Sequence, residues 1–176
     1  MYFITGNKNK FEEIRLVLPD IEMLKLDLPE LQSMDVHEIV RAKLAVAKEH
    51  GTFPCIVEDT AYSCDGLNGL PGPFIKFFLQ ALTREKFFNL VNSTGNTRST
   101  GKTVIGYSDG THDAFFEGEI SGEIVYPRGE SGFGYDPLFI PDGDTRTYAE
   151  MTRQEKRPFS SRGRAAEKLK SYLSEK

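Results

Sequence analysis

The segment that most constrains the fold of this chain is a short apolar run, residues 55–57, that leads directly into the carboxylates of Glu58 and Asp59. A short unbroken apolar run predicts a buried strand, parallel to its neighbours and covered on both faces. The two carboxylates would then lie at the carboxyl end of that strand, where open α/β sheets bind their ligands. The segment therefore predicts an α/β fold with an acidic site, although a solvated acid pair is the simpler alternative.

Length and composition restrict the class of protein. The 176 residues suffice for one domain with a sizeable core, so we expect a single domain over residues 1–176. The net charge of −4 gives no global basic field for nucleic acid or membrane surfaces, and no apolar run approaches the ~20 residues that span a bilayer. Two cysteines and no recognisable signal peptide indicate a cytoplasmic protein, and three scattered histidines make a zinc site unexpected.

The N-terminal segment has the pattern of a phosphate-binding turn. Residues 2–4 predict a strand, and a helix follows in which Phe11, Ile14 and Leu18 share one face. The polar residues 5–10 lie between them and include two lysines. Backbone N–H groups at a helix N-terminus attract an anion, and a nearby lysine adds charge. A plain strand–helix turn explains the pattern equally well.

A second helix is predicted after a possible strand over residues 21–28. Asp35 is the expected N-cap, with Glu38 as its capping-box partner, and Gly51 the expected stop. Lys43 lies outside the apolar stripe, so a solvated side chain is its simpler interpretation. The expected buried face comprises Val36, Ile39, Val40, Leu44 and Ala47.

Two further helices are predicted after a glycine-rich loop, residues 66–72. Residues 74–82 are apolar nearly all round, which indicates either deep burial or cover by another subunit. Lys76 is the one charge in that run. The next helix, residues 83–91, is expected to pack Phe87, Leu90 and Val91 inward.

Alternation of apolar and polar residues then predicts a two-stranded ribbon, with strands over residues 103–107 and 114–125 and a turn at 108–110. Such a ribbon can form one lobe of a cleft. Gly118 and Gly122 in its second strand suggest bulges or tight bends.

The C-terminal part contains an aromatic loop and a basic helix start. Phe133 and Tyr135 stand between glycines, where little cover leaves them free to stack on a planar base, although a turn that packs them inward is the alternative. Ser160 or Ser161 is expected to cap the last helix. The lysine and arginines of residues 155–164 oppose that helix dipole, a cost that a shared anion would offset.

Taken together, these motifs resemble the inosine triphosphate pyrophosphatase family, and the resemblance runs almost end to end. Each motif alone is weak, but their order and spacing are specific. The motifs are Thr5-Gly6-Asn7-x-x-Lys10, Leu28-Pro29-Glu30, Glu58-Asp59-Thr60, Gly69-Leu70-Pro71-Gly72-Pro73, Gly132-Phe133-Gly134-Tyr135-Asp136-Pro137-x-Phe139 and Ser160-Ser161-Arg162-Gly163-Arg164.

The resemblance implies an elongated α/β fold in which helices flank a twisted mixed sheet and two lobes enclose a central cleft. It also implies a homodimer that requires Mg²⁺. The implied activity is hydrolysis of non-standard purine nucleoside triphosphates (ITP, dITP and XTP) to the monophosphate and pyrophosphate, which cleanses the nucleotide pool. A related pyrophosphatase with another base preference, or a non-catalytic nucleotide-binding protein, is the alternative.

The same resemblance implies roles for individual residues. Asp59 would be the general base, and Glu30 and Glu58 would bind Mg²⁺, which favours carboxylates together with phosphates and waters. Phosphate and substrate binding would involve Thr5, Gly6, Asn7, Lys10, Lys43, Thr60, Lys76 and Lys156. The base-binding set would be Phe133, Gly134, Tyr135, Asp136, Ser161 and Arg162, with Phe133 stacking on the base, Asp136 accepting from N1–H and Arg162 donating to O6.

The chain departs from the family pattern at Ser161, where the family usually has histidine. The histidine normally helps to read the 6-oxo edge of the purine, and a serine hydroxyl has shorter reach and no charge. Of the properties that the resemblance implies, base selectivity is therefore the one that the residues of this chain support least. Tyr135 also stands where tryptophan is common.

Overall fold

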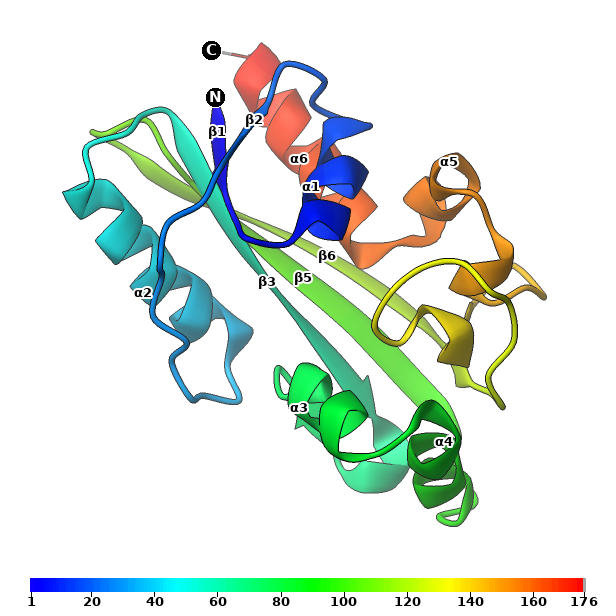
Figure 1. Ribbon diagram of the computed structural model, residues 1–176. Helices are drawn as coiled ribbons and strands as arrows, with labels where there is room; N and C mark the ends of the chain where they lie inside the picture. The colour runs from blue at the N-terminus through cyan, green and yellow to red at the C-terminus, as the bar shows by residue number, and fades with distance from the viewer. Residues whose placement is uncertain (176) are drawn as a thin grey trace.

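The computed structural model describes residues 1–175 and shows a seven-stranded, twisted, mixed sheet flanked by helices (Figure 1). The strand order is β2-β1-β3-β5-β6-β7, with β4 paired to the far end of β3. Within these residues, only β1 pairs in parallel, with β2 and β3, and the remaining strand pairs are antiparallel. The predicted elongated α/β fold is confirmed.

Three long strands form the body of the sheet: β3 (Cys55–Cys64), β5 (Arg98–Ser108) and β6 (Asp113–Ile124). The prediction that Glu58 and Asp59 end a parallel strand is wrong, because β3 continues past them and pairs antiparallel with β5. The strand that ends near Glu58 and Asp59 is β1 (Tyr2–Ile4), which pairs in parallel with β3 only as far as Ile56. The carboxylates therefore lie just beyond the carboxyl end of β1.

Helices cover opposite faces of one half of the sheet. α1 (Lys8–Arg15) and α6 (Ser161–Ser174) pack on one face around Ile56 and Ile105. α2 (Val36–Glu49) packs on the other face. Both termini lie at this end of the molecule (Figure 1). The pleat accounts for the two cores, because successive side chains of β3 point to opposite faces.

The start of α2 differs from prediction in one respect. Asp35 is the N-cap, and its carboxylate accepts from the His37 N–H at 2.8 Å. Glu38 forms no capping box and instead accepts from the Ser33 hydroxyl at 2.7 Å. All five residues predicted for the apolar face are buried, and the helix ends before Gly51, whose φ is +67°.

The far half of the sheet carries shorter elements. α3 (Ile75–Ala81) and α4 (Arg84–Asn92) pack against the third core, and Phe87 and Val91 are buried there as predicted. Leu90 is exposed, so the prediction that it packs inward is wrong. In α3 only Ile75 is buried, so of the two alternatives predicted for that helix, deep burial is wrong. The remaining elements are β2 (Glu22–Leu24), β4 (Pro71–Gly72), β7 (Phe139–Pro141), α5 (Arg153–Lys156) and the 3₁₀ turns Asp65–Leu67, Asp136–Leu138, Tyr148–Glu150 and Arg157–Phe159.

Gly118 and Gly122 do not mark bulges, since β5 and β6 pair without interruption from Arg98↔Glu123 to Ser108↔Asp113. They instead allow close packing of other elements. A Cβ on Gly118 would lie 2.0 Å from the Ser161 carbonyl oxygen, and one on Gly122 would lie 2.1 Å from that of Ile140. Gly118 thus allows the start of α6 to rest on the sheet.

The middle of β3, between its pairings with β1 and β4, borders a cleft. On the edge away from β5, β3 pairs with β1 up to Ile56 and with β4 from Tyr62 onward. Within residues 1–175, no strand pairs with residues 57–61 on that side. In the same part of the chain, no helix is long and apolar enough to cross a bilayer.

Candidate active site

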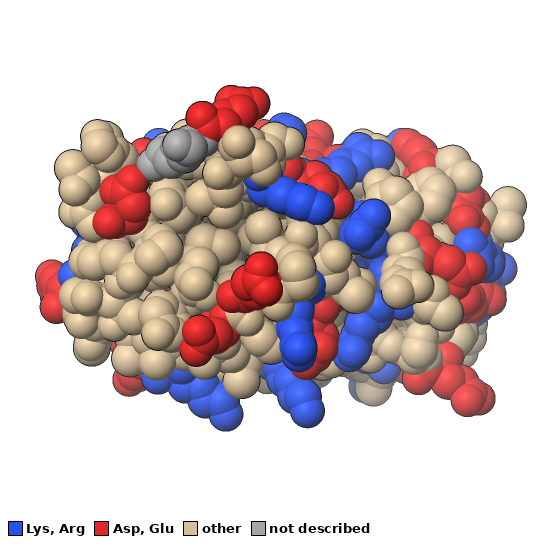
Figure 2. Space-filling view, turned by 90° about the horizontal axis from the view of Figure 1, so that it is seen from above, with Lys and Arg blue, Asp and Glu red and all other residues tan. Residues whose placement is uncertain are grey.

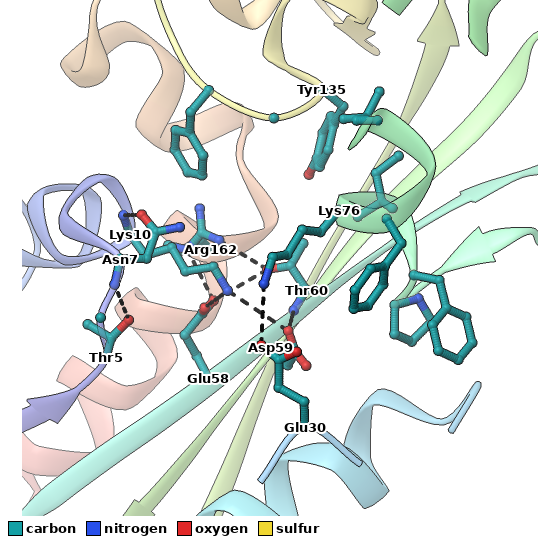
Figure 3. Close-up of a pocket in the computed structure, with 18 of the residues that line it drawn as sticks. Thr5, Asn7, Lys10, Glu30, Glu58, Asp59, Thr60, Lys76, Tyr135 and Arg162 are labelled. Carbon is teal, nitrogen blue, oxygen red and sulfur yellow. Dashed lines mark hydrogen bonds and ion pairs between the residues drawn. The ribbon is translucent and has the colours of Figure 1, made fainter. Parts of the chain in front are cut away.

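A cleft of about 1220 Å³ lies beside residues 57–61 of β3 (Figure 3). Its walls come from the β1–α1 turn, the loop after β2, α3, the aromatic loop and the start of α6. The volume slightly exceeds the ~300–1,000 Å³ typical of small-molecule sites. Every residue predicted for the site lines this cleft, and thus the structure brings together segments from both ends of the sequence.

The turn after β1 is organised by its own side chains. The Asn7 side chain caps α1 by accepting from the N–H groups of Asn9 and Lys10, at 3.0 and 3.2 Å. The Thr5 hydroxyl accepts from the Asn7 N–H at 3.1 Å. A Cβ on Gly6 would have no atom within 4 Å, so the turn is open to the cleft there.

Glu58 is a buried and ionised carboxylate. Its side chain is 1% exposed, contacts the Lys10 ammonium and accepts from Arg162 Nε at 3.1 Å. Burial alone would raise the pKa of Glu58, but the charges of Arg162, Lys10 and Lys43 outweigh it and lower the pKa to about 2. Glu58 therefore remains negatively charged at neutral pH.

Asp59 lies next to Glu58 but points to the opposite face of β3, toward α2. Its Oδ2 accepts from the Lys43 ammonium at 3.0 Å, and its Oδ1 accepts from the Thr60 N–H at 2.9 Å. The solvated interpretation of Lys43 is therefore wrong. Lys10 also reaches Asp59, with its ammonium 3.9 Å from Oδ1, so one cation lies between the two neighbouring carboxylates.

Glu30 and Lys76 lie at the cleft mouth, on the side facing Asp59 (Figure 3). Their charged groups are 3.4 Å apart, and the Glu30 side chain is 66% exposed. Within residues 1–175, no group of three or more His, Cys, Asp or Glu side chains is arranged to hold a metal ion. A magnesium ion with phosphate and water ligands needs only one or two carboxylates, and Glu58 and Glu30 both line the cleft.

A buried ion network, which the sequence did not predict, supports the opposite wall. Glu13 of α1 accepts from the Lys156 ammonium at 2.7 Å and also pairs with Arg162. Burial would raise the pKa of Glu13, but these two cations outweigh it and lower that pKa. Lys156 also donates to both oxygens of Asp136, each at 2.8 Å. Nothing local indicates this role, since Glu13 lies 143 and 149 positions from its partners.

The aromatic loop presents its two rings differently. The Phe133 ring has the Lys156 ammonium 5.2 Å and the Arg162 guanidinium 5.7 Å from its centroid. The Tyr135 ring packs inward on Tyr62, with centroids 4.2 Å apart, so the expectation of little cover is wrong for Tyr135. Its hydroxyl still faces the cleft, and burial raises its pKa (Figure 3). A second residue that was not predicted, Arg84, donates to the Gly134 carbonyl at 3.1 Å and ties α4 to this loop.

The start of α6 contributes Ser161 and Arg162. Ser160 is the N-cap and accepts from the Gly163 N–H at 2.9 Å. The buried Ser161 hydroxyl is hydrogen-bonded to Thr103 of β5 at 2.8 Å. Arg162 donates to Glu58, Glu13 and Thr60, so its guanidinium is engaged within the cleft wall.

The charges of the cleft nearly balance. Seven Lys and Arg side chains and six Asp and Glu side chains line it, a difference of +1. Figure 2 shows basic side chains gathered across the middle of the upper face. The cleft is thus slightly positive in a protein whose net charge is −4.

Comparison with known proteins agrees with this geometry. The pattern that defines the Ham1 family matches residues 1–172. The chain belongs to the Ham1 family. The inosine triphosphate pyrophosphatase of Schizosaccharomyces pombe is 38% identical over 176 residues, an alignment that covers 97% of this chain and 93% of the yeast protein.

Solved structures of Ham1-like proteins share the fold. A HAM1 protein from Coxiella burnetii superposes with a TM-score of 0.84 at 27% identity, covering 99% of this chain and 98% of that one. A nucleoside-triphosphatase, described as a dITP/XTP pyrophosphatase, from Mycobacterium abscessus superposes with a TM-score of 0.68 at 26% identity, covering 96% and 97%. The predicted family membership is confirmed.

Proposed function

We propose that this Ham1 protein hydrolyses non-standard purine nucleoside triphosphates (ITP, dITP and XTP) to the monophosphate and pyrophosphate. The observation that carries the proposal is the pair of adjacent carboxylates, Glu58 and Asp59, held among lysines at the unpaired edge of β3. The relative from Schizosaccharomyces pombe and the structure from Mycobacterium abscessus carry the same class of activity in their names.

Asp59 is the proposed general base. Water would attack the α-phosphorus, the bond from that phosphorus to the pyrophosphate oxygen would break, and Asp59 would take the proton from the water. Lys43 and Lys10 hold the carboxylate in place, while Glu58 stays ionised beside it. Two adjacent carboxylates can then perform separate tasks.

The proposed phosphate-binding groups lie around these carboxylates. The turn Thr5-Gly6-Asn7 presents backbone N–H groups at the start of α1, and Thr60 lies beside Glu58 on β3. Positioning and charge neutralisation supply most of the catalysis of phosphoryl transfer. Lys10, Lys43, Lys76 and Lys156 are the proposed cationic groups of the substrate site.

Magnesium is the proposed cofactor, held by Glu58 and Glu30. The charge difference of +1 in the cleft supports this, because a triphosphate brings several negative charges that the lysines alone do not balance. The ion would neutralise the phosphates and orient them. Omission of magnesium or addition of a chelator should abolish pyrophosphate release, and full activity in a chelator would refute this cofactor assignment.

Base binding is proposed at the opposite end of the cleft. Phe133 is placed to stack on a purine, with Gly134 and Tyr135 shaping the loop around it. Asp136 and Arg162 are the predicted hydrogen-bonding partners of the base edge. Both already form ion pairs, Asp136 with Lys156 and Arg162 with Glu58, so hydrogen bonds to the base would add to these contacts. Their direct contact with the base stays a prediction.

The decisive experiment is a pyrophosphate-release assay over a panel of nucleoside triphosphates. We expect the highest kcat/KM with ITP, dITP or XTP. Preference for a pyrimidine or methylated base would indicate a related pyrophosphatase with another selectivity, which Ser161 in place of histidine makes the main alternative. Binding without turnover would indicate a nucleotide sensor, and release of free phosphate would indicate an ordinary phosphatase.

We propose that the protein is a homodimer and that it is located in the cytoplasm. α3 supports the assembly, because its Phe77 side chain is 51% exposed in the single chain, whereas Ile75, Phe78 and Leu79 pack against the core.

A further inference from the structure

A row of hydroxyl groups connects the base end of the cleft with the catalytic carboxylates. The Ser161 hydroxyl is 2.8 Å from that of Thr103, which in turn is 2.9 Å from that of Thr60. The Thr60 hydroxyl is 3.3 Å from Glu58 Oε2. Thr103 lies at the centre of this row and is fully buried, and it belongs to β5, outside the sequence motifs described above.

The charges at one end of the row decide which hydroxyl donates to which. Arg162 Nη2 donates to the Thr60 oxygen at 3.1 Å, so the single Thr60 proton must point elsewhere. The Glu58 carboxylate is paired with the Lys10 ammonium and with Arg162 Nε, and a carboxylate held between two cations accepts hydrogen bonds, so the bond from Thr60 to Glu58 is favoured. Thr103 must then donate to Thr60, and Ser161 must donate to Thr103.

We infer that Thr103 is a specificity-determining positioning residue that holds Ser161 as a pure hydrogen-bond acceptor toward the base. The Ser161 side chain lines the cleft with its one proton already committed to Thr103, so it offers lone pairs to a ligand. A partner on the purine must therefore be a donor. The N1–H group of a 6-oxopurine is a donor at the position where adenine has a bare acceptor nitrogen.

The neighbouring groups favour Ser161 for this task. Asp136, the other candidate acceptor, already accepts from the Lys156 ammonium and the Phe133 N–H. A Cβ on Gly101 would lie 3.8 Å from Ser161 Oγ and 3.1 Å from the Tyr135 hydroxyl oxygen. The glycine thus keeps the space beside both hydroxyls free of a side chain.

This inference rests on the proposed function, and its test compares kcat/KM for ITP and ATP by pyrophosphate release. In Thr103→Val, a nearly isosteric change, the Ser161 proton is freed and the hydroxyl can turn to donate to adenine N1. We expect the ITP:ATP ratio to fall about tenfold, since one mismatched hydrogen bond is thereby relieved for adenine. Thr103→Ser, which keeps the hydroxyl, should retain the native ratio.

Ser99→Ala is the matched control, because Ser99 lies on the same strand and is equally buried, but its hydroxyl bonds to Tyr62 at 2.8 Å, away from the row. It should leave the ratio unchanged. Ser161→Ala should lower the ratio by removing the acceptor, and addition of Thr103→Val to it should lower the ratio no further.

Three results would overturn the inference. They are an unchanged or increased ratio in Thr103→Val, a fall of similar size in Ser99→Ala, and loss of activity on every triphosphate in Thr103→Val alone. The proposed function fails separately, if the native protein releases no pyrophosphate from ITP. Native release together with an unchanged ratio in Thr103→Val would reject only the role of Thr103.

Discussion

Glu58 and Asp59 are neighbours in the sequence, but the pleat of β3 directs their side chains into different surroundings. Glu58 faces α1 and α6 and is enclosed by Lys10 and Arg162. Asp59 faces α2 and pairs with Lys43 while about a fifth of its side chain remains exposed. Adjacent positions of β3 thus supply one carboxylate that is ionised at neutral pH and one accessible base.

Asp59→Asn should keep the shape of the site and lose most turnover, because the amide cannot take a proton from water. Loss of a general base typically costs ~10²–10⁴-fold in rate. Asp113→Asn is the matched control, since Asp113 also pairs with a lysine, Lys48 at 2.7 Å, but outside the cleft. Steady-state kinetics at saturating ITP and magnesium test this, and near-native turnover in Asp59→Asn would remove Asp59 from its assigned role.

Glu58→Gln should destabilise the protein most at neutral pH. The folded-state pKa of Glu58 is lowered to about 2 from its ordinary value of 4.5, so its stabilisation is present above pH 4.5 and is lost as the pH falls toward 2. A shift of this size corresponds to about 3 kcal/mol. Denaturant unfolding at several pH values should show the difference between native protein and variant shrinking below pH 4.5.

The exposed pair of Asp142 with Arg98 gives the control for that measurement. Asp142→Asn should change the free energy of unfolding only slightly at any pH, since exposed ion pairs contribute little. A difference for Glu58→Gln that stays constant from pH 7 to pH 3 would contradict the assignment of an ionised Glu58.

Single-residue roles were predictable where a local pattern carries them. The caps at Asp35 and Ser160 and the acid pair on β3 all follow from short-range sequence. Glu13 and Thr103 were missed because their partners are far away in the chain, and neither belongs to a motif. Lys43 was misjudged for the same reason, since helical position alone does not reveal that Asp59 lies opposite.

At the scale of elements, most helices and strands were predicted but their neighbours were not. β3 was expected to be a short parallel strand, whereas it has ten residues and pairs mainly with β5. An apolar run reveals burial but not the direction of the adjacent strand. Glycines within a strand pattern are similarly ambiguous between a bulge and a close approach, and at Gly118 the structure shows the latter.

Gly118→Ala should shift the start of α6, because the new Cβ would lie 2.0 Å from the Ser161 carbonyl oxygen and 2.6 Å from the Ala165 nitrogen. Both are helix backbone atoms, so a side-chain rotation cannot relieve the clash. We expect a loss of about 1–3 kcal/mol in unfolding free energy, typical of overpacking, and reduced kcat through displacement of Arg162.

Gly6→Ala is the control for stability, since its Cβ would meet no atom within 4 Å and Gly6 lacks a positive φ. Its melting temperature should stay close to that of the native protein. Equal melting temperatures for Gly118→Ala and native protein would show that α6 is not seated on β6 as closely as described.

For the whole molecule, the arrangement places the cleft where the two halves of the sheet meet. α1, α2 and α6 lie around one half, and α3, α4 and the aromatic loop around the other (Figure 1). The sequence indicated this through the resemblance to a family, whose motifs come from both halves. Physical patterns alone predicted the α/β class but not the antiparallel order of the long strands, which depends on contacts between distant segments.

The exposed side of α3 bears on the oligomeric state of the whole molecule. The Phe77 side chain of α3 is 51% exposed in the single chain, which is unusual for a large aromatic residue. Of the seven residues of α3, only Ile75 is buried. We propose that a second copy of the chain covers this side chain, and obligate interfaces bury ~2,000 Å² or more.

Light scattering should give twice the chain mass of 19.8 kDa at micromolar concentration. Phe77→Glu should shift the protein to monomer, because a carboxylate in an apolar interface lacks a partner. Leu90→Glu, on the neighbouring helix at 41% exposure, should remain dimeric. A native mass near 19.8 kDa would reject the dimer, and a dimeric Phe77→Glu variant would place the interface elsewhere.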